Sequence, residues 1–270
     1  MRAFVRRLSA KLADGELTHL ARTPVDMPRA FAQHATYLEA LRDHGLALFE
    51  LPELSLQPDA VFVEDVLLWL DGRLVVTRPG AASRRGELPS VVSALQRLKL
   101  AFDAIEAPAT LDGGDVLVLA RHVLVGRSTR SNEAGREQLA ALLRSRATPR
   151  ASAGRSDMAV LGIDLERALH LKTAVTALPD GSLIANPGCV DTGALAALGY
   201  RVQHALEPSG ADVLCLGASV LLPADAPRTA AALHEQGFSV QMLDISELQK
   251  LEAGMTCMSV LWQDSARSVD

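Results

Sequence analysis

Three residues that lie far apart in this sequence have the side-chain types of an activated cysteine nucleophile. Asp112 lies in the segment TLDGGDV, His170 in LHLKT and Cys257 in GMTCMS. A thiol attacks as its thiolate, an imidazole exchanges protons near neutral pH, and a carboxylate can orient the imidazole. Such residues need to be close in space and not in sequence. The three therefore form one candidate site, provided that the fold brings them together.

Two acidic residues, Glu64 and Asp65, interrupt the apolar run AVFVEDVLLWL. A buried carboxylate is costly unless it is paired, so the pair indicates either a receptor for a cationic ligand or a strand end at a solvated loop. The run predicts a strand over residues 60–70, and neighbouring side chains of a strand point to opposite faces. At most one of the two carboxylates is therefore expected to enter a given pocket directly.

The glycine pair Gly113-Gly114 lies between Asp112 and Asp115. Residues without a Cβ let the backbone turn sharply or approach another group closely. A carboxylate-rich turn without further function has the same local sequence. The pair therefore predicts an unusual backbone at this point but not its purpose.

Each of these signals is weak when it is considered alone. A single histidine is more often a structural residue than a catalyst, and a single cysteine is more often an inert buried side chain. Arg84 and Arg130 lie in the polar loops SRRGE and STRSNE, where arginines are usually solvated. The combination and order of the segments carry more information than any one of them.

The composition is that of a compact protein with free thiols. The 270 residues are 49% hydrophobic and 22% charged, which suffices for one large domain or two small ones. The formal net charge of -5 disfavours nucleic acid as the main partner. Cys189, Cys215 and Cys257 have the spacing neither of a disulfide framework nor of a structural zinc site. With no signal peptide and no apolar run near the roughly 20 residues of a membrane span, we expect a cytoplasmic protein without membrane contact.

Strand-like runs and amphipathic helical runs alternate along the chain. Four hairpins are predicted, with turns at Asp71-Gly72, Arg121-His122, Pro179-Asp180-Gly181 and Gly217-Ala218. Helices are predicted at 28–44, 88–98, 132–146, 192–198 and 225–236. Strands or strand pairs that bear on the candidate site are predicted at 60–70, 169–178 and 257–262.

A hairpin, a helix and a strand recur with a period of roughly 50 residues, which is typical of radial or solenoid repeats. A doubly wound sheet would instead show plain strand–helix alternation and a glycine-rich first turn. Gly113-Gly114 lacks the remaining glycines of a dinucleotide fingerprint. We therefore expect a repeat-based α/β fold, in which the Ala/Ser/Arg/Gly run at 145–157 is the one candidate for a mobile loop.

In its motifs the chain resembles the dimethylarginine dimethylaminohydrolase (dimethylargininase) family of the guanidine-modifying, or pentein, superfamily. The resemblance rests on six segments in family order over nearly the whole chain: PDAVFVEDV (58–66), TRPGAASRR (77–85), TLDGGDVL (110–117), LVGRSTRSNEAG (124–135), LHLKT (169–173) and TCMSV (256–260). It implies an α/β fold, a fivefold pseudosymmetric α/β-propeller built of ββαβ-type modules, with residues 1–270 as a single catalytic domain. The repeat pattern agrees with this architecture.

The resemblance also implies a role for each candidate residue. Cys257 is expected to be the nucleophile, His170 the general acid and base, and Asp112 the partner that orients His170. The implied substrate-binding residues are Glu64 and Asp65 for the guanidinium, Asp59 for the α-amino group, Arg84 and Arg130 for the α-carboxylate, and Leu17 in GELTH within a lid loop. No metal and no organic cofactor is implied.

The implied reaction is hydrolysis of an Nω-methylated arginine to citrulline and a methylamine through a covalent cysteine S-alkylthiouronium. The Cys257 thiolate attacks the guanidinium carbon, His170 protonates the departing amine, and His170 then acts as base for water. Neighbouring carboxylates disfavour a thiolate. We therefore expect the free protein to hold mostly thiol and the cationic substrate to stabilise the thiolate.

Several other functions stay open on the sequence alone. An arginine deiminase of the same superfamily is expected to be larger and to carry an aspartate two positions after the catalytic histidine, where this chain has Lys172. An amidinotransferase would pass the amidino group to a second amine. A non-catalytic propeller that binds an amino acid, with Cys257 as a redox-sensitive thiol, is the alternative of a different class. The expected partner is a small-molecule methylated arginine, and a homodimer stays open.

Overall fold

The computed structural model describes residues 1–145 and 158–263, so the predicted loop at 145–157 lies, apart from its first residue, outside the described residues. The described residues form five three-stranded sheets. Their strands, sheet by sheet, are β15 (Val260–Trp262), β1 (Arg2–Arg6) and β2 (Ala47–Leu51); β3 (Leu67–Leu70), β4 (Arg73–Val76) and β5 (Phe102–Ala104); β6 (Val116–Val118), β7 (His122–Arg127) and β8 (Ala159–Asp164); β9 (Val175–Ala177), β10 (Leu183–Ala185) and β11 (Val202–His204); β12 (Leu214–Leu216), β13 (Ser219–Pro223) and β14 (Ser239–Leu243).

The helices connect the second and third strands of the sheets or precede a sheet. They are α1 (Met27–Asp43), α2 (Leu88–Arg97), α3 (Glu133–Ser145), α4 (Leu171–Ala174), α5 (Thr192–Ala197), α6 (Pro227–Glu235) and α7 (Ser246–Gln249). Short 3-10 turns are η1 (Leu12–Asp14), η2 (Pro58–Val61), η3 (Val63–Asp65), η4 (Ala82–Glu87), η5 (Gly113–Asp115) and η6 (Pro208–Ala211). None of the helices in the described part of the chain is long and apolar enough to cross a bilayer.

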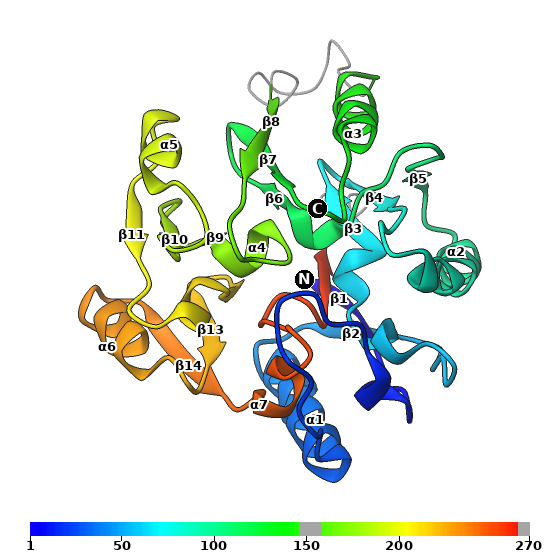
Figure 1. Cartoon of the computed structure of the whole chain (residues 1–270), viewed down its shortest axis with the longest axis horizontal. Coiled ribbons are helices and arrows are strands. Elements are labelled where there is room, and N and C mark those ends of the chain that lie inside the picture. The colour runs from blue at the N-terminus through cyan, green and yellow to red at the C-terminus, as the bar shows by residue number, and fades with distance from the viewer. Residues whose placement is uncertain (146–157, 264–270) are drawn as a thin grey trace, which may run out of the picture.

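Every sheet has the same pairing pattern, one antiparallel and one parallel pair, and in four of them the antiparallel pair is a hairpin. In β3-β4-β5, a hairpin pairs Leu67 with Val76 in antiparallel fashion, α2 follows, and the third strand runs parallel to the second, with Leu74 opposite Phe102. The unit is therefore a ββαβ module. Figure 1 shows five such modules arranged around a central axis, with α1, α2, α3, α5 and α6 at the periphery. The predicted fivefold α/β-propeller is confirmed.

One module joins the two ends of the described chain. β15 pairs antiparallel with β1, and β1 pairs in parallel with β2, so that Phe4 lies opposite Val260 on one side and Phe49 on the other. The ring is thereby closed by strands from opposite ends of the sequence.

The hairpin turns use the residues that the sequence supplies for them. Asp71 and Gly72 have φ values of 45° and 82°, so both lie in the left-handed region that a type I′ turn requires. Gly181 and Gly217, with φ values of 80° and 63°, provide the left-handed residue of two further hairpins. These predicted turns are confirmed.

Each peripheral helix buries an apolar stripe against its sheet. In the module of β3, Val91 and Leu95 of α2 belong to one buried cluster with Leu67, Leu74 and Val76. Full burial of such a side chain contributes about 1.5–3 kcal/mol. Apolar packing of this kind fixes the modules, and their polar loops then gather near the axis.

The strand predictions near the candidate site are wrong in part. Residues 58–65 form the turns η2 and η3, and β3 begins only at Leu67. Residues 171–174 form the short helix α4, and the last strand begins at Val260 rather than at Cys257. The apolar side chains of these turns are buried between modules and not by a strand partner, so an apolar run here does not indicate extended backbone.

Candidate active site

Three aspartates at corresponding places in three modules connect neighbouring modules around the axis. Each directly precedes the first hairpin of its module, in the tripeptide Asp-Val-Leu that recurs at 65–67, 115–117 and 212–214. Asp65 accepts a hydrogen bond from the Gly114 N–H at 3.2 Å, and Asp115 accepts one from the Leu171 N–H at 3.1 Å. Asp212 accepts one from the Thr256 N–H at 3.1 Å. The loops that carry the candidate catalytic residues are therefore held by buried carboxylates of the preceding modules.

The glycine pair permits close contact between these loops. A Cβ on Gly113 would lie 2.0 Å from the carbonyl oxygen of Glu64, and one on Gly114 would lie 2.7 Å from both Asp65 Oδ1 and His170 Nδ1. Neither distance leaves room for a side chain. Of the two uses that the sequence indicated for the pair, close approach is the one that the structure requires.

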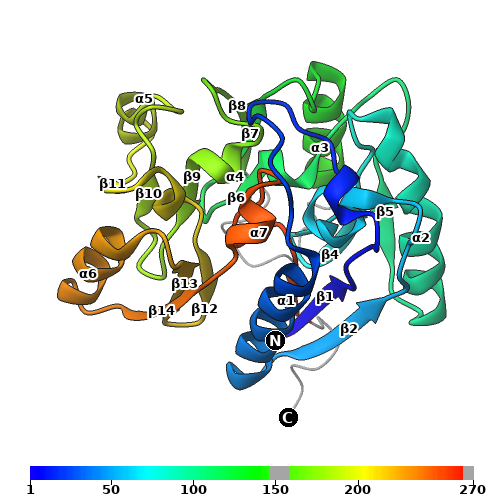
Figure 2. The same ribbon diagram turned by 60° about the horizontal axis from the view of Figure 1, so that its bottom comes forward.

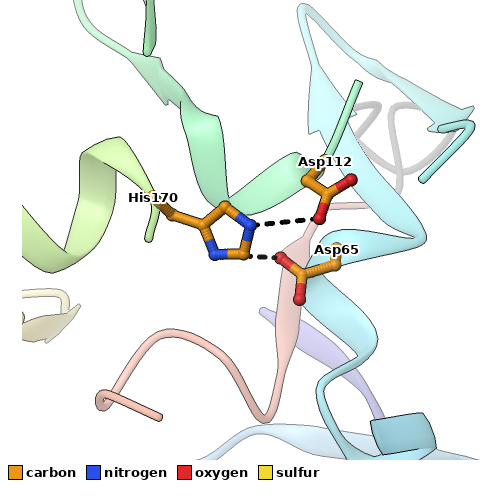
Figure 3. A group of neighbouring side chains, drawn as sticks. All are labelled: Asp65, Asp112 and His170. Carbon is orange, nitrogen blue, oxygen red and sulfur yellow. Dashed lines mark hydrogen bonds and ion pairs between the residues drawn. The ribbon is translucent and has the colours of Figure 1, made fainter. Parts of the chain in front are cut away.

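His170 lies between two carboxylates (Figure 3). Its Nε2 is 3.0 Å from Asp112 Oδ2, and its Nδ1 is 3.7 Å from Asp65 Oδ1. All three side chains are buried. Burial disfavours the imidazolium, but the carboxylates of Asp65, Asp112 and Asp115 outweigh it and raise the pKa of His170 to about 9. At neutral pH the ring is therefore a proton donor.

Asp112 is also held in place by hydrogen bonds to two neighbouring loops. Its Oδ1 accepts a hydrogen bond from the Gly80 N–H at 2.8 Å, and its own N–H donates to Ser131 Oγ at 3.1 Å. Gly80 packs directly on Arg130, since a Cβ would lie 2.3 Å from the Arg130 carbonyl oxygen. The hydrogen bonds to Gly80 and Ser131 thus fix the orientation of Asp112, the predicted partner of His170.

Asp115 supports the same histidine segment, a role that sequence reasoning missed. Its Oδ2 accepts hydrogen bonds from Ser128 Oγ at 2.5 Å and Ser131 Oγ at 2.6 Å, while Oδ1 bonds Leu171 next to His170. Burial raises the pKa of Asp115 to about 6. The repeated Asp-Val-Leu tripeptide was the sequence signal that could have identified Asp115 and Asp212.

Cys257 is buried at the same place. Its Sγ accepts a hydrogen bond from the Gly254 N–H at 3.3 Å, and its carbonyl oxygen accepts one from the Glu64 N–H at 3.2 Å. Burial and the carboxylates of Asp212, Glu64 and Asp65 raise the pKa of Cys257 well above its usual range. The unliganded protein therefore carries a thiol and not a thiolate.

Glu64 and Asp65 have different partners. Glu64 forms an ion pair with Lys172 and accepts a hydrogen bond from Thr256 Oγ1 at 2.9 Å. Asp65 forms an ion pair with Arg84. Burial works against ionisation of Asp65, but His170 and Arg84 hold its pKa below the usual value. The two side chains separate as predicted, although a 3-10 turn and not a strand separates them.

Six predicted site residues line one small cavity. Its lining includes Asp59, Asp65, Arg84, Arg130, His170 and Cys257. Asp112 lies behind His170, and Glu64 and Leu17 are not among the lining residues. The volume of about 20 Å³ is room for about one water molecule and far below the several hundred Å³ of usual ligand pockets. In this conformation the cavity is therefore too small for an amino-acid substrate.

The segment between β1 and α1 borders the cavity. Figure 2 shows it in dark blue, rising from β1 and crossing toward β7 and β8 before it returns to α1. Glu16 of this segment lines the cavity, and Leu17 is half-buried against a hydrophobic cluster that includes Cys257. The segment has the position of the lid loop that was predicted around Leu17.

Arg84 is surrounded by protein acceptors. Besides Asp65, its guanidinium donates to Glu87, at 2.8 and 3.1 Å, and to the carbonyl oxygens of Asp59 and Phe62 at 3.0 and 2.9 Å. This side chain holds Asp59 and Asp65 in place. Binding of a substrate carboxylate by Arg84 stays a prediction, as does the assignment of each other predicted substrate contact.

A larger hollow of about 510 Å³ lies next to the cavity and shares Leu169, Glu252 and Ala253 with it. Asp212 lies in its lining, and in the described residues Asp212 Oδ2 is a buried oxygen without a hydrogen-bond partner. Burial and the charge of Glu64 raise the pKa of Asp212 to about 7. This carboxyl group was not recognised from the sequence.

One group in the described residues has the ligand atoms and spacing to hold a metal ion. The side-chain ligand atoms of Asp65, Asp112 and His170 all lie within 4.8 Å of one another. They are the same three residues that make the His170 contacts described above. A cation there would compete with protonation of the ring.

Comparison with known proteins finds relatives of this chain in both sequence and structure. The sequence model of the family described as arginine deiminase matches residues 57–204. An N(G),N(G)-dimethylarginine dimethylaminohydrolase from Streptomyces coelicolor is 40% identical over 96% of each chain. The protein of that name from Pseudomonas aeruginosa is 32% identical over 95% of this chain and 97% of its own. A structure of the Pseudomonas aeruginosa enzyme, a cysteine-to-serine mutant complexed with citrulline, has a TM-score of 0.84 at 30% identity and covers 96% of this chain and 98% of its own.

Proposed function

Because this chain belongs to the dimethylarginine dimethylaminohydrolase family, we propose that its buried Cys257, His170 and Asp112 hydrolyse Nω-methylated arginines to citrulline and a methylamine. The observation that carries the residue assignment is the position of His170. Its ring bonds Asp112 on one side, faces Asp65 on the other, and borders the same closed cavity as Cys257.

The reaction begins when the Cys257 thiol, on binding of the cationic substrate, loses its proton to solvent. The resulting thiolate attacks the guanidinium carbon and forms a C–S bond. His170, protonated at neutral pH, gives its proton to the substituted nitrogen while the C–N bond breaks. The methylamine leaves, and an S-alkylthiouronium remains on Cys257. The neutral ring then takes a proton from water as the water oxygen attacks the same carbon. Cleavage of the C–S bond restores the thiolate, and loss of the remaining hydroxyl proton to solvent gives the neutral ureido group of citrulline, which is released.

The cationic substrate supplies the charge that the thiolate lacks in the free protein. Asp212, Glu64 and Asp65 disfavour a negative sulfur as long as the cavity contains no cation. A bound guanidinium adjacent to Asp65 compensates these carboxylates and lowers the free energy of the thiolate. Substrate binding and activation of Cys257 are therefore coupled.

We expect the amino-acid end of the substrate to bind Arg130 and Asp59, which also line the cavity. Arg130 suits a carboxylate, and Asp59 suits an ammonium. Arg84 backs both Asp59 and Asp65 and is placed to add to the positive charge near the carboxylate. Since the closed cavity holds about one water molecule, the lid around Leu17 has to open for substrate to enter.

Citrulline release tests this function. Purified protein is incubated with asymmetric dimethylarginine, monomethylarginine and arginine in parallel, with Cys257→Ser as the inactive control. Turnover of the methylated substrates and not of arginine is the expected result. Turnover of arginine alone would assign the chain to the arginine deiminases, and release by Cys257→Ser would remove the nucleophile assignment.

A further inference from the structure

Glu16 in the lid contacts both groups that are assigned to the amino-acid end of the substrate. Its backbone N–H donates to Asp59 Oδ2 at 3.2 Å, and its carboxylate lies 3.4 Å from Arg130 Nη1. Ser83 Oγ donates to the other carboxylate oxygen. Glu16 therefore offers its backbone N–H to the Asp59 carboxylate and its own carboxylate to the Arg130 guanidinium. Both Asp59 and Arg130 line the cavity.

The lid around Glu16 is ordered by further contacts. Three successive amides, of Thr18, His19 and Leu20, donate to the carboxylate of Glu252, and Thr18 Oγ1 also accepts from Arg130 at 3.3 Å. Successive amides that converge on one anion form a specific turn geometry. The placement of Glu16 is thus a property of a defined lid conformation.

We propose that Glu16 is an internal competitor that occupies the site of the substrate α-carboxylate when the lid is closed over an empty cavity. The proposal rests on the proposed function for the identity of the displaced ligand. Glu16 N–H takes the place of the substrate ammonium at Asp59, and the Glu16 carboxylate takes the place of the substrate carboxylate at Arg130.

This arrangement makes Glu16 a specificity-determining residue. An α-amino acid offers its own ammonium and carboxylate to Asp59 and Arg130, so it replaces both lid contacts. A guanidinium or ureido compound without a carboxylate cannot replace Glu16 at Arg130. The Glu16–Arg130 ion pair therefore stays intact when such a compound binds, and removal of Glu16 does not change its affinity. The Glu16–Arg130 pair is partly exposed, because 41% of the Glu16 side chain is accessible, so its removal is expected to change affinity by about 3- to 5-fold.

The first experiment uses the ligand-free protein and does not depend on the substrate. Hydrogen exchange of residues 13–22 is compared in wild type, Glu16→Gln and Asp14→Asn. Asp14 is exposed, lies in the same segment and does not line the cavity, so it controls for the change of charge. Faster exchange in Glu16→Gln alone is expected. Equal exchange in all three proteins overturns the proposal.

The second experiment measures ligand affinity by calorimetry in a Cys257→Ser background. Glu16→Gln is expected to bind citrulline about 3- to 5-fold more tightly, with no change for N-carbamoylputrescine, which is citrulline without its carboxylate. Equal gains for both ligands, or a loss of citrulline affinity, overturn the proposal, since a loss would place Glu16 at the substrate ammonium. If citrulline does not bind to the Cys257→Ser protein, the proposed function fails, while the exchange experiment still decides whether Glu16 holds the lid.

Discussion

Lys172 forms an ion pair with Glu64 directly beneath the candidate nucleophile loop. The pair leaves Asp65 as the carboxylate of the Glu64-Asp65 sequence that borders the cavity. Lys172 also stands two positions after His170, where an arginine deiminase is expected to carry an aspartate. The Lys172 ammonium therefore neutralises Glu64, so Asp65 is the acidic residue of this pair that we expect at the guanidinium.

This division of roles predicts that Asp65→Asn weakens substrate binding more than Glu64→Gln does. A hydrogen bond to a charged group contributes about 1.5–3 kcal/mol, so Asp65→Asn is expected to raise KM for asymmetric dimethylarginine about 10- to 100-fold. Glu64→Gln is expected to raise it less than about 3-fold, because the Glu64 carboxylate is already paired with Lys172. Steady-state kinetics measure both values. A larger effect of Glu64→Gln would place Glu64 at the guanidinium.

Alkylation of Cys257 is expected to depend on the charge of the reagent. Since burial and carboxylates raise the pKa of Cys257 well above its usual range, iodoacetamide should react slowly at pH 7 and faster as the pH rises. A haloacetamidine carries the cation that compensates the carboxylates and should react rapidly at pH 7. Cys257→Ser corrects for modification of Cys189 and Cys215. Equal rates with both reagents at pH 7 would show that the thiolate does not require a cation.

Asp212→Asn is expected to stabilise the fold above neutral pH. The pKa of Asp212 is raised from 3.8 to about 7, so between these values the folded protein binds more protons than the unfolded chain, and stability falls as the pH rises. The loss is complete above pH 7 and amounts to a few kcal/mol. An asparagine can still accept the Thr256 N–H. The variant should therefore exceed wild type in free energy of unfolding at pH 8 and match it near pH 4.

Urea unfolding at the two pH values measures this difference. Asp225→Asn is the matched control, because Asp225 lines the same hollow but is exposed. A variant of Asp212 that is less stable than wild type at pH 8 would mean that the charged carboxylate stabilises the fold.

Arg84→Lys and Arg130→Lys are expected to differ in what they damage. Arg84 donates to several buried acceptors in a geometry that an ammonium cannot reproduce, so Arg84→Lys should lower Tm by several degrees, at about 2–4 °C per kcal/mol. Arg130→Lys should leave Tm nearly unchanged and raise KM. Calorimetry and kinetics on the same preparations separate the two effects. An unchanged Tm in Arg84→Lys would assign Arg84 to the substrate rather than to the scaffold.

The regular parts of this fold follow from short-range sequence signals. Asp71-Gly72 predicts its hairpin because both residues adopt left-handed backbone readily. The helix near Met27 begins where Asp26 accepts the Arg29 N–H, and Pro28 fits the first turn. Repetition of these signals predicts the modules, and a ring of modules predicts that their loops meet.

The sequence predictions are wrong where contacts with another module determine the backbone conformation. Residues 60–66 are apolar enough for a strand, but Glu64 contacts the loop of Cys257, so the chain turns there. Asp212 is separated from Thr256 by more than one element, and nothing near it in sequence predicts their hydrogen bond. The lid contacts of Glu16 are of the same kind. Local periodicity contains no information on such partners. The recurring Asp-Val-Leu tripeptide marks Asp115 and Asp212 as equivalent to Asp65 but does not identify the residues they contact.

The sheet of β15, β1 and β2 makes the nucleophile dependent on the whole length of the chain. Two residues separate Cys257 from β15, and β15 pairs with β1 from the opposite end of the described chain. Asp112 and His170 are held by modules that follow one another in sequence, whereas Cys257 is positioned through a pairing of strands from opposite ends. A chain in which β15 does not pair with β1 therefore retains the residues of the Asp112–His170 contact but has no fixed position for the Cys257 thiol beside them.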